Sequence, residues 1–140
     1  MSAGEYTETQ VRVRYAETDQ MGVVYYANYF IWFELGRVEH LRARGIVYRD
    51  MEEDGVKIAV VEARCRYKAP ARYDDLITIR TRVARQRNAV VHFEYQLMRA
   101  GDGVMLAEGE TVHVCIDRNF EACPLPDKYR EQVGGGREDA

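Results

Sequence analysis

The distribution of apolar side chains predicts one long, buried helix in the first third of the chain. The helix is expected to begin near residues 26–28 and to end near Gly45. Its large apolar residues cover well over half of a helical circumference: Tyr29, Phe30, Trp32, Phe33, Leu35, Val38 and Leu41. A helix that is apolar nearly all round is buried rather than lying on a surface. Because no other segment shows a helical pattern of this quality, we expect a sheet to wrap around this helix.

The remaining apolar residues recur mainly at every second position, which is the period of β-strands. The predicted strands span residues 9–15, 58–68, 77–83, 91–97 and 104–117, and a short helical turn is expected within 46–53. The chain order is therefore one strand, the long helix and four further strands. This order predicts an α+β fold in which a five-stranded antiparallel sheet is wrapped around one long central helix.

For two of these strands the sequence predicts which side chains share a face. One face of the strand at 58–68 carries Ala59, Val61, Ala63, Cys65 and Tyr67. The other face becomes charged, and one buried face opposite one solvent-exposed face is typical of an antiparallel sheet. In the strand at 104–117 the apolar residues change from one face to the other partway along, which predicts a β-bulge near Gly109.

Length, composition and charge limit the classes of protein to consider. A chain of 140 residues, 46% of them hydrophobic, is the size of one domain with its own core. A formal net charge of −3 argues against a nucleic-acid partner. We find no signal peptide and no apolar run near the ~18 residues of a membrane helix, so we expect a cytoplasmic protein without membrane insertion. We also expect a flexible N-terminus at 1–7, a folded domain at 8–130 and a flexible tail at 131–140.

The cysteines and histidines form no recognisable metal or disulfide pattern. Cys65, Cys115 and Cys123 are an odd number of cysteines at wide spacing, without a CxxC pair. The histidines are spread over the chain without the spacing of metal ligands. We therefore expect reduced cysteines and no metal site.

One candidate for chemistry lies in the polar loop before the helix. Asp19 stands close to the helix start, where unpaired backbone N–H groups and a partial positive charge are available. An aspartate there can be a turn or capping residue. It can also be a catalytic carboxylate facing a carbonyl whose oxygen those N–H groups polarise. Spacing alone does not decide between these two interpretations.

A motif that includes this aspartate resembles a known family. The run TDQMGVVYYANYFIWFE contains, at set spacings before the helix, Asp19, Gly22, Tyr25, Tyr26, Asn28 and Tyr29. It resembles the active-site segment of the 4-hydroxybenzoyl-CoA thioesterase family of hotdog-fold proteins, and APARYDDLITIRT resembles that family's turn between the second and third strands. The resemblance covers roughly residues 8–130. It implies a hotdog fold and hydrolysis of acyl-CoA thioesters to CoA and a carboxylic acid, without a metal or redox cofactor.

The resemblance also implies roles for single residues. Asp19 would attack the thioester or activate water, while the backbone N–H near Tyr26 would hold the carbonyl oxygen. Many relatives have His at the position of Tyr26. A phenol of pKa about 10 is a poor base, so we expect Tyr26 to donate a hydrogen bond or, alternatively, to pack at the helix start. The substrate-binding residues expected beside them are Tyr15, Gly22, Val24 and Tyr25. If Tyr15 lies outside the site, we expect it in the core.

The resemblance further implies a homodimer as the smallest active unit, often paired into a homotetramer, with the site between subunits. Arg85 and Arg87, in the connection between two predicted strands, are candidates for binding the CoA phosphates. An ordinary solvated turn is the alternative for these arginines.

Two other functions stay open. A thioesterase for acyl carrier protein or polyketide chains would tolerate loss of both arginines, and a non-catalytic acyl-CoA-binding protein could use the same fold. The acyl group also stays open, because the aromatic residues at the helix start suit a benzoyl-sized or an aliphatic pocket.

Overall fold

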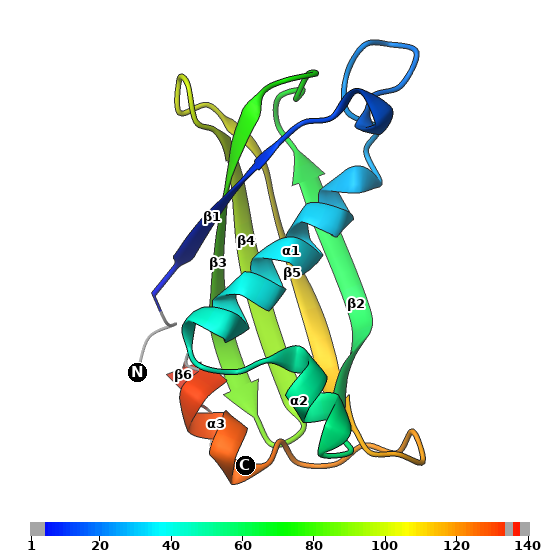
Figure 1. The fold of residues 1–140 in the computed structure, drawn as a ribbon, viewed down its shortest axis with the longest axis vertical. Helices are drawn as coiled ribbons and strands as arrows, with labels where there is room; N and C mark the ends of the chain where they lie inside the picture. Colours follow the sequence, from blue (N-terminus) through cyan, green and yellow to red (C-terminus); the bar gives the residue numbers. More distant parts are fainter. Residues whose placement is uncertain (1–4, 134–135, 138–140) are drawn as a thin grey trace.

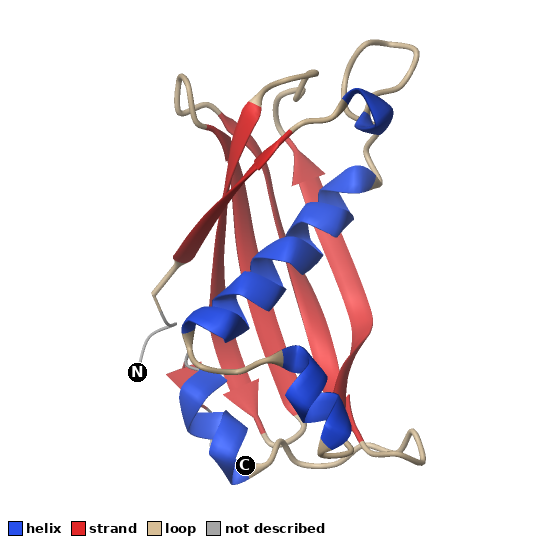
Figure 2. Cartoon of the chain, in the orientation of Figure 1, coloured by secondary structure: helices blue, strands red, loops and turns tan. Residues whose placement is uncertain are grey.

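The computed structural model describes residues 5–133 and 136–137, in which a curved sheet wraps around a long helix (Figures 1 and 2). Within these residues the helices are α1 (Asn28–Ala43), α2 (Tyr48–Glu53) and α3 (Asp127–Val133), and a 3₁₀ turn, η1, spans Tyr15–Glu17. The strands are β1 (Thr7–Arg12), β2 (Lys57–Tyr67), β3 (Leu76–Arg87), β4 (Val90–Arg99), β5 (Met105–Ile116) and β6 (Gly136–Arg137). The order across the sheet is β1-β3-β4-β5-β2, with antiparallel neighbours, and β6 pairs in parallel with β3.

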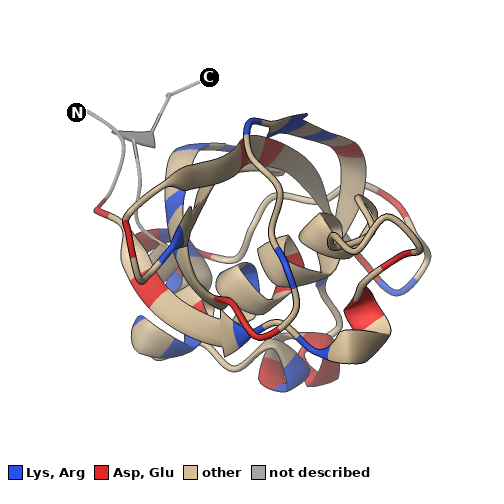
Figure 3. Ribbon diagram, turned by 90° about the horizontal axis from the view of Figure 1, so that it is seen from above, with Lys and Arg blue, Asp and Glu red and all other residues tan. Residues whose placement is uncertain are grey.

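The predicted arrangement of a five-stranded antiparallel sheet around a central helix is confirmed. Figure 3, which looks along the long axis of the molecule, shows the sheet curling around α1. The short helix expected within 46–53 is also present, as α2. Among the described residues, none of the helices has both the length and the apolar character needed to cross a membrane.

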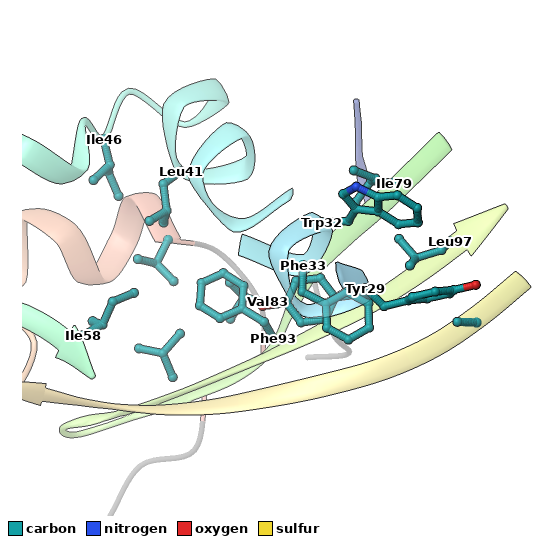
Figure 4. Close-up of a cluster of buried hydrophobic side chains, with 14 of the residues drawn as sticks. Tyr29, Trp32, Phe33, Leu41, Ile46, Ile58, Ile79, Val83, Phe93 and Leu97 are labelled. Atoms are coloured by element: carbon teal, nitrogen blue, oxygen red, sulfur yellow. The ribbon is translucent and has the colours of Figure 1, made fainter. Parts of the chain in front are cut away.

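The core lies between α1 and the concave face of the sheet. Figure 4 shows side chains of α1 packed among those of β3 and β4, including Tyr29, Trp32, Phe33, Ile79, Val83, Phe93 and Leu97. The ring of Phe33 stacks on that of Tyr95, with ring centroids 4.3 Å apart. Full burial of each Phe-sized side chain contributes about 1.5–3 kcal/mol, so this aromatic layer is a main source of the free energy of folding.

Two glycines allow α1 to lie close to the sheet. A Cβ added to Gly36 of α1 would lie 2.3 Å from Thr81 Oγ1. A Cβ added to Gly109 of β5 would lie 2.3 Å from the carbonyl oxygen of Arg64 and 2.8 Å from the ring of Phe33. No real Cβ atom tolerates such contacts, so both positions need a residue without a side chain.

The bulge predicted in the last strand is present, but it lies at Leu106 of β5, three residues before Gly109. The buried residues of β5 alternate through Gly109 without a break: Ala107, Gly109, Thr111, His113 and Cys115. Leu97 pairs with Ala107 and Met98 pairs with Met105, so Leu106 is the extra residue, and the other register shifts lie at Val60/Glu62 and Val83/Arg85. The predicted position was wrong because Thr111 and His113 bond to each other (2.8 Å) and can therefore be buried, while Val112 and Val114 are only half-buried on the other face.

The prediction of one buried face along β2 was wrong for most of the strand. Ile58 is buried, whereas Val61 and Ala63 are exposed. The shift at Val60/Glu62 also separates Ala59 from the face that Ala63, Cys65 and Tyr67 share. In the described part of the chain β2 pairs only with β5, so it is an edge strand of the sheet.

The predicted boundaries differ from the structure at both ends. The first strand is Thr7–Arg12, so it begins inside the expected flexible segment 1–7 and ends before Tyr15. Residues 131–133 belong to α3, where Val133 is buried, and residues 136–137 pair with β3. The folded domain therefore extends past residue 130. The rest of both expected flexible segments, 1–4, 134–135 and 138–140, lies outside the described residues.

Candidate active site

The loop between η1 and α1 is closed on itself by backbone hydrogen bonds. Thr18 and Val24 form an isolated antiparallel bridge. The N–H of Asp19 donates to the carbonyl of Val23 (2.9 Å), and the N–H of Gly22 donates to the carbonyl of Asp19 (3.0 Å). Gly22 has a φ of 81°, in the left-handed region that glycine adopts without strain. The predicted glycine thus serves the tight turn that holds the aspartate.

Asp19 is half-buried, and its two carboxylate oxygens are in different situations. Oδ1 accepts a hydrogen bond from the backbone N–H of Met21 (2.9 Å), which is an Asx turn. Oδ2 accepts none from the residues that the structure describes. The turn role that we considered is therefore present, and it leaves one oxygen available for chemistry.

Asp19 lines an open groove of about 350 Å³ beside the start of α1. The lining residues come from the loop, from the first turn of α1 and from the end of β2 with the residues after it: Asp19, Met21, Val23, Val24, Tyr26, Tyr29, Tyr67, Lys68, Ala69 and Pro70. Most of these side chains are apolar or aromatic, with one carboxylate and one amine among them. Such a groove suits a molecule with an apolar body and a few polar groups.

The start of α1 has unpaired backbone donors next to this groove. The N-cap residue, Ala27, supplies no side-chain cap. The N–H of Asn28 donates to the carbonyl of Tyr25 (2.9 Å). The N–H groups of Tyr26 and Ala27 find no acceptor within residues 5–133 and 136–137. Together with the helix dipole, these donors favour a negatively charged or polarised oxygen at this point.

Tyrosines form the wall opposite the loop. The hydroxyl of Tyr67 donates to the carbonyl of Tyr26 (3.0 Å), and the two rings meet edge to face. Tyr29 packs against Tyr67 with centroids 5.0 Å apart. Burial raises the pKa of both Tyr29 and Tyr67 above the ordinary value of 10. These two phenols stay neutral at physiological pH and can act as hydrogen-bond donors but not as bases.

The structure brings together part of the predicted site. Asp19, Val24 and Tyr26 line the groove, Gly22 forms its turn, and Tyr25 lies beside Tyr26 with ring centroids 4.8 Å apart. Tyr15 is not in the core and lies outside the lining of this groove, so its role in substrate binding stays a prediction. Its side chain is 77% exposed and packs edge to face on Tyr73, outside the groove lining.

Arg85 and Arg87 lie far from this groove within one protomer. The Leu76 end of β3 lies at the same end of the molecule as the loop before α1, and the Arg87 end lies at the opposite end (Figure 1). A strand rises about 3.3 Å per residue, so Arg85 lies roughly 30 Å from Leu76. Arg85 instead contacts Nδ1 of His92 (3.1 Å).

Sequence reasoning missed the residues that β2 contributes to the groove. Tyr67 was predicted only to lie on one face of a strand, and no role in the site was predicted for Pro70. The signal available in the sequence was an aromatic and a basic residue directly before Ala69-Pro70, where a strand must stop and its last side chains lie at the sheet edge.

The fold and the groove define a hotdog-type protein with an acid beside the N-terminus of its central helix. Over residues 13–133 the chain matches the family model described as the thioesterase-like superfamily, so it belongs to that family. The predicted family and the hotdog fold are confirmed.

Named relatives agree with this family. The acyl-CoA thioester hydrolase YbgC of Escherichia coli O6:H1 is 35% identical over 107 residues, which cover 76% of this chain and 79% of that protein. The crystal structure of hypothetical protein TT1821 from Thermus thermophilus has a TM-score of 0.87 at 38% identity, covering 91% and 96% of the two chains. That of the DHNA-CoA thioesterase from Staphylococcus aureus has a TM-score of 0.87 at 30% identity, covering 91% and 87%. The predicted enzyme class, thioester hydrolase, is thus confirmed by the relatives.

Proposed function

We propose that this protein hydrolyses acyl-CoA thioesters to CoA and a carboxylic acid, with Asp19 as nucleophile or general base. The observation that carries the proposal is a carboxylate with one available oxygen, in a groove beside two unpaired N–H groups of a helix start. The names of relatives such as YbgC and the Staphylococcus aureus enzyme support CoA thioesters as the substrate class.

In the proposed reaction the thioester carbonyl oxygen accepts hydrogen bonds from the backbone N–H groups of Tyr26 and Ala27. These donors stabilise the negative charge that develops on this oxygen in the transition state. Asp19 Oδ2 either attacks the carbonyl carbon, giving an anhydride that water then cleaves, or removes a proton from the attacking water. In both routes the C–S bond breaks and CoA leaves as the thiolate. When water attacks the acyl carbon, its oxygen ends in the carboxylic acid and Asp19 returns to the free carboxylate.

The walls of the groove suit the acyl group and the carrier arm of the substrate. Tyr29 and Tyr67 offer aromatic faces to an acyl group, and Tyr26 offers a phenol hydroxyl as a hydrogen-bond donor. Lys68 is the basic residue in the lining, and Glu108 lies 3.5 Å from its amine. Contact of Arg85 and Arg87 with CoA stays a prediction, and at this groove it would require the arginines of a second copy of the chain.

The test is release of free thiol from a panel of aromatic and aliphatic acyl-CoA thioesters. We expect the wild-type protein to release CoA from at least one of them, and Asp19→Asn to reduce kcat by about 10³-fold or more while leaving the circular dichroism spectrum unchanged. Asn keeps the oxygen that accepts the Met21 N–H, so the turn survives.

A matched control is Asp102→Asn. Asp102 makes the same kind of turn, accepting the N–H of Val104 at 3.1 Å, but does not line the groove. We expect wild-type kcat for this variant. Full activity of folded Asp19→Asn would remove the catalytic assignment, and wild-type protein that binds acyl-CoA without releasing CoA would favour a binding function.

A further inference from the structure

Glu17 is a buried acid next to the candidate site, although it does not line the groove. Its side chain and backbone together are only 5% exposed. Oε1 accepts the backbone N–H of Arg14 (2.8 Å), and Oε2 accepts the indole Nε1–H of Trp32 (3.2 Å). Trp32 is itself 1% exposed, on the second turn of α1. A buried carboxylate needs such donors, and these two come from segments on opposite sides of the loop.

The backbone of the same residue makes the complementary contacts. The carbonyl oxygen of Glu17 accepts the N–H of Tyr25 (2.9 Å) and the side-chain Nδ2–H of Asn28 (2.8 Å). Glu17 is therefore bonded to the chain before the loop, to the chain just before the helix and to the helix itself. Asp19 lies two residues after Glu17, and Tyr26 lies one residue after Tyr25, whose N–H donates to the Glu17 carbonyl.

We propose that Glu17 is a positioning residue that fixes the Asp19 carboxylate relative to the N–H groups of Tyr26 and Ala27. The proposal rests on the function proposed above for Asp19. Glu17 connects both sides of the catalytic geometry, the acid in the loop and the donors at the helix start, through one side chain and one carbonyl group. Displacement of a reacting group by about 1 Å can cost 10²-fold in rate, so a loosened Glu17 should act on catalysis through Asp19.

The contacts of Glu17 can be removed one at a time. In Glu17→Gln the side chain keeps its size, but one acceptor oxygen becomes an NH₂ donor, so Arg14 N–H and Trp32 Nε1–H can no longer both be satisfied. Trp32→Phe removes the indole donor while keeping an aromatic ring. We expect each variant to lower kcat by about 10-fold to 100-fold with little change in KM, because the groove lining is unaltered.

The two variants should also be coupled. Trp32→Phe removes the bond between Glu17 and Trp32, and in the double variant the one amide oxygen left at position 17 can serve the Arg14 N–H alone. The double variant should therefore lose less activity than the product of the single losses. If the two substitutions damaged the fold independently, their losses of activity would instead multiply. The coupling therefore separates an effect through this bond from general damage to the fold.

A control for lost stability alone is Asp54→Asn, at the opposite end of the molecule. Asp54 accepts a hydrogen bond from the Tyr129 hydroxyl and pairs with Lys128 (2.6 Å), between the end of α2 and α3. We expect this variant to melt at a lower temperature and to keep wild-type kcat and KM.

The outcomes distinguish this proposal from the proposed function. If Glu17→Gln melts lower than wild type but keeps wild-type kcat, as Asp54→Asn should, Glu17 is only structural and the proposal is overturned. It is also overturned if the losses of the single variants multiply in the double variant. If wild-type protein cleaves no thioester, or Asp19→Asn keeps full activity, the proposed function fails first and the positioning role fails with it.

Discussion

At the scale of single residues, His113 should make the stability of the protein depend on pH. The side chain is 1% exposed, Nε2 lies 2.8 Å from Thr111 Oγ1, and Nδ1 has no partner among the described residues. Burial, together with a smaller effect of the nearby charge of Arg37, lowers the pKa of His113 to about 3. The folded protein therefore holds this imidazole neutral, whereas the unfolded chain takes up a proton below pH about 6.5.

The expected result is a loss of stability on acidification. The contribution of neutral His113 is fully present above pH about 6.5 and decreases as the pH falls toward 3, by at most about 1.4 kcal/mol per pH unit. Burial also lowers the pKa of His40, so it acts in the same direction. Urea denaturation between pH 4.5 and 7.5 measures this slope.

The slope should be smaller in His113→Gln. Val112→Ala is the control, because Val112 is the half-buried neighbour of His113 on β5 and carries no titratable group, so this variant should leave the slope unchanged. Equal slopes in wild-type protein and His113→Gln would contradict the assignment of the pH dependence to His113.

Some residues of the candidate site can be predicted from the sequence alone, and others cannot. The spacing of Asp19, Gly22 and Tyr26 before an apolar helix is a local pattern, so these residues could be found without a structure. Glu17 could not, because an acid in a polar run looks solvent-exposed until Trp32, fifteen residues later, is folded against it. Tyr67 was missed for a similar reason, since its place in the groove depends on where β2 ends relative to α1.

At the scale of elements, the contact between α1 and β3 depends on Gly36. In an exposed helix, replacing Gly by Ala stabilises the helix by about 1 kcal/mol. At Gly36 the added Cβ would lie 2.3 Å from Thr81 Oγ1 and 2.8 Å from Ile79 Cγ2, so α1 would have to move away from the sheet. We expect Gly36→Ala to destabilise the protein by about 1–3 kcal/mol, as overpacking usually does.

The measurement is chemical denaturation of Gly36→Ala beside Gly101→Ala. Gly101 lies in the loop between β4 and β5, and an added Cβ would meet nothing within 4 Å, so this control should stay near wild-type stability. A Gly36→Ala variant as stable as wild type would mean that α1 does not pack against β3 as closely as described.

The elements themselves were largely predictable, and the failures have physical causes. The spacing of apolar residues along the sequence predicted α1 and the strands β1 to β5. Burial on one side of an antiparallel sheet makes apolar and polar residues alternate along each strand. The faces of β2 and β5 were misassigned for opposite reasons. In β5 the polar residues Thr111 and His113 satisfy each other in the core, whereas in β2 the apolar residues Val60 and Val61 lie exposed.

At the scale of the whole molecule, the open edge of β2 points to self-association. Strand β2 is 11 residues long and pairs with β5 on one side, and its other side pairs with no strand of the described chain. On this strand Val60 and Val61 are 50% and 62% exposed. A long edge strand with apolar neighbours is a template for pairing with another strand.

A second copy of the chain can pair with the open side of β2 and satisfy its backbone N–H and C=O groups. Antiparallel pairing of β2 with β2 of the partner around a two-fold axis would place the same surface on both sides of the contact. This is the homodimer that the family resemblance implies, and it stays a prediction here. A homotetramer would need a further contact between two such dimers.

The prediction is that wild-type protein sediments as a dimer or tetramer at micromolar concentration. Replacing Val60 and Val61 by Lys places two charges on the edge strand that would pair with its copy, so we expect a shift to monomer and, if the site lies between subunits, a matching loss of activity. Val104→Lys is the control, because Val104 is a similarly exposed valine in the β4–β5 loop. Sedimentation velocity separates these cases, and a wild-type monomer at tens of micromolar would show that this edge stays unpaired in solution.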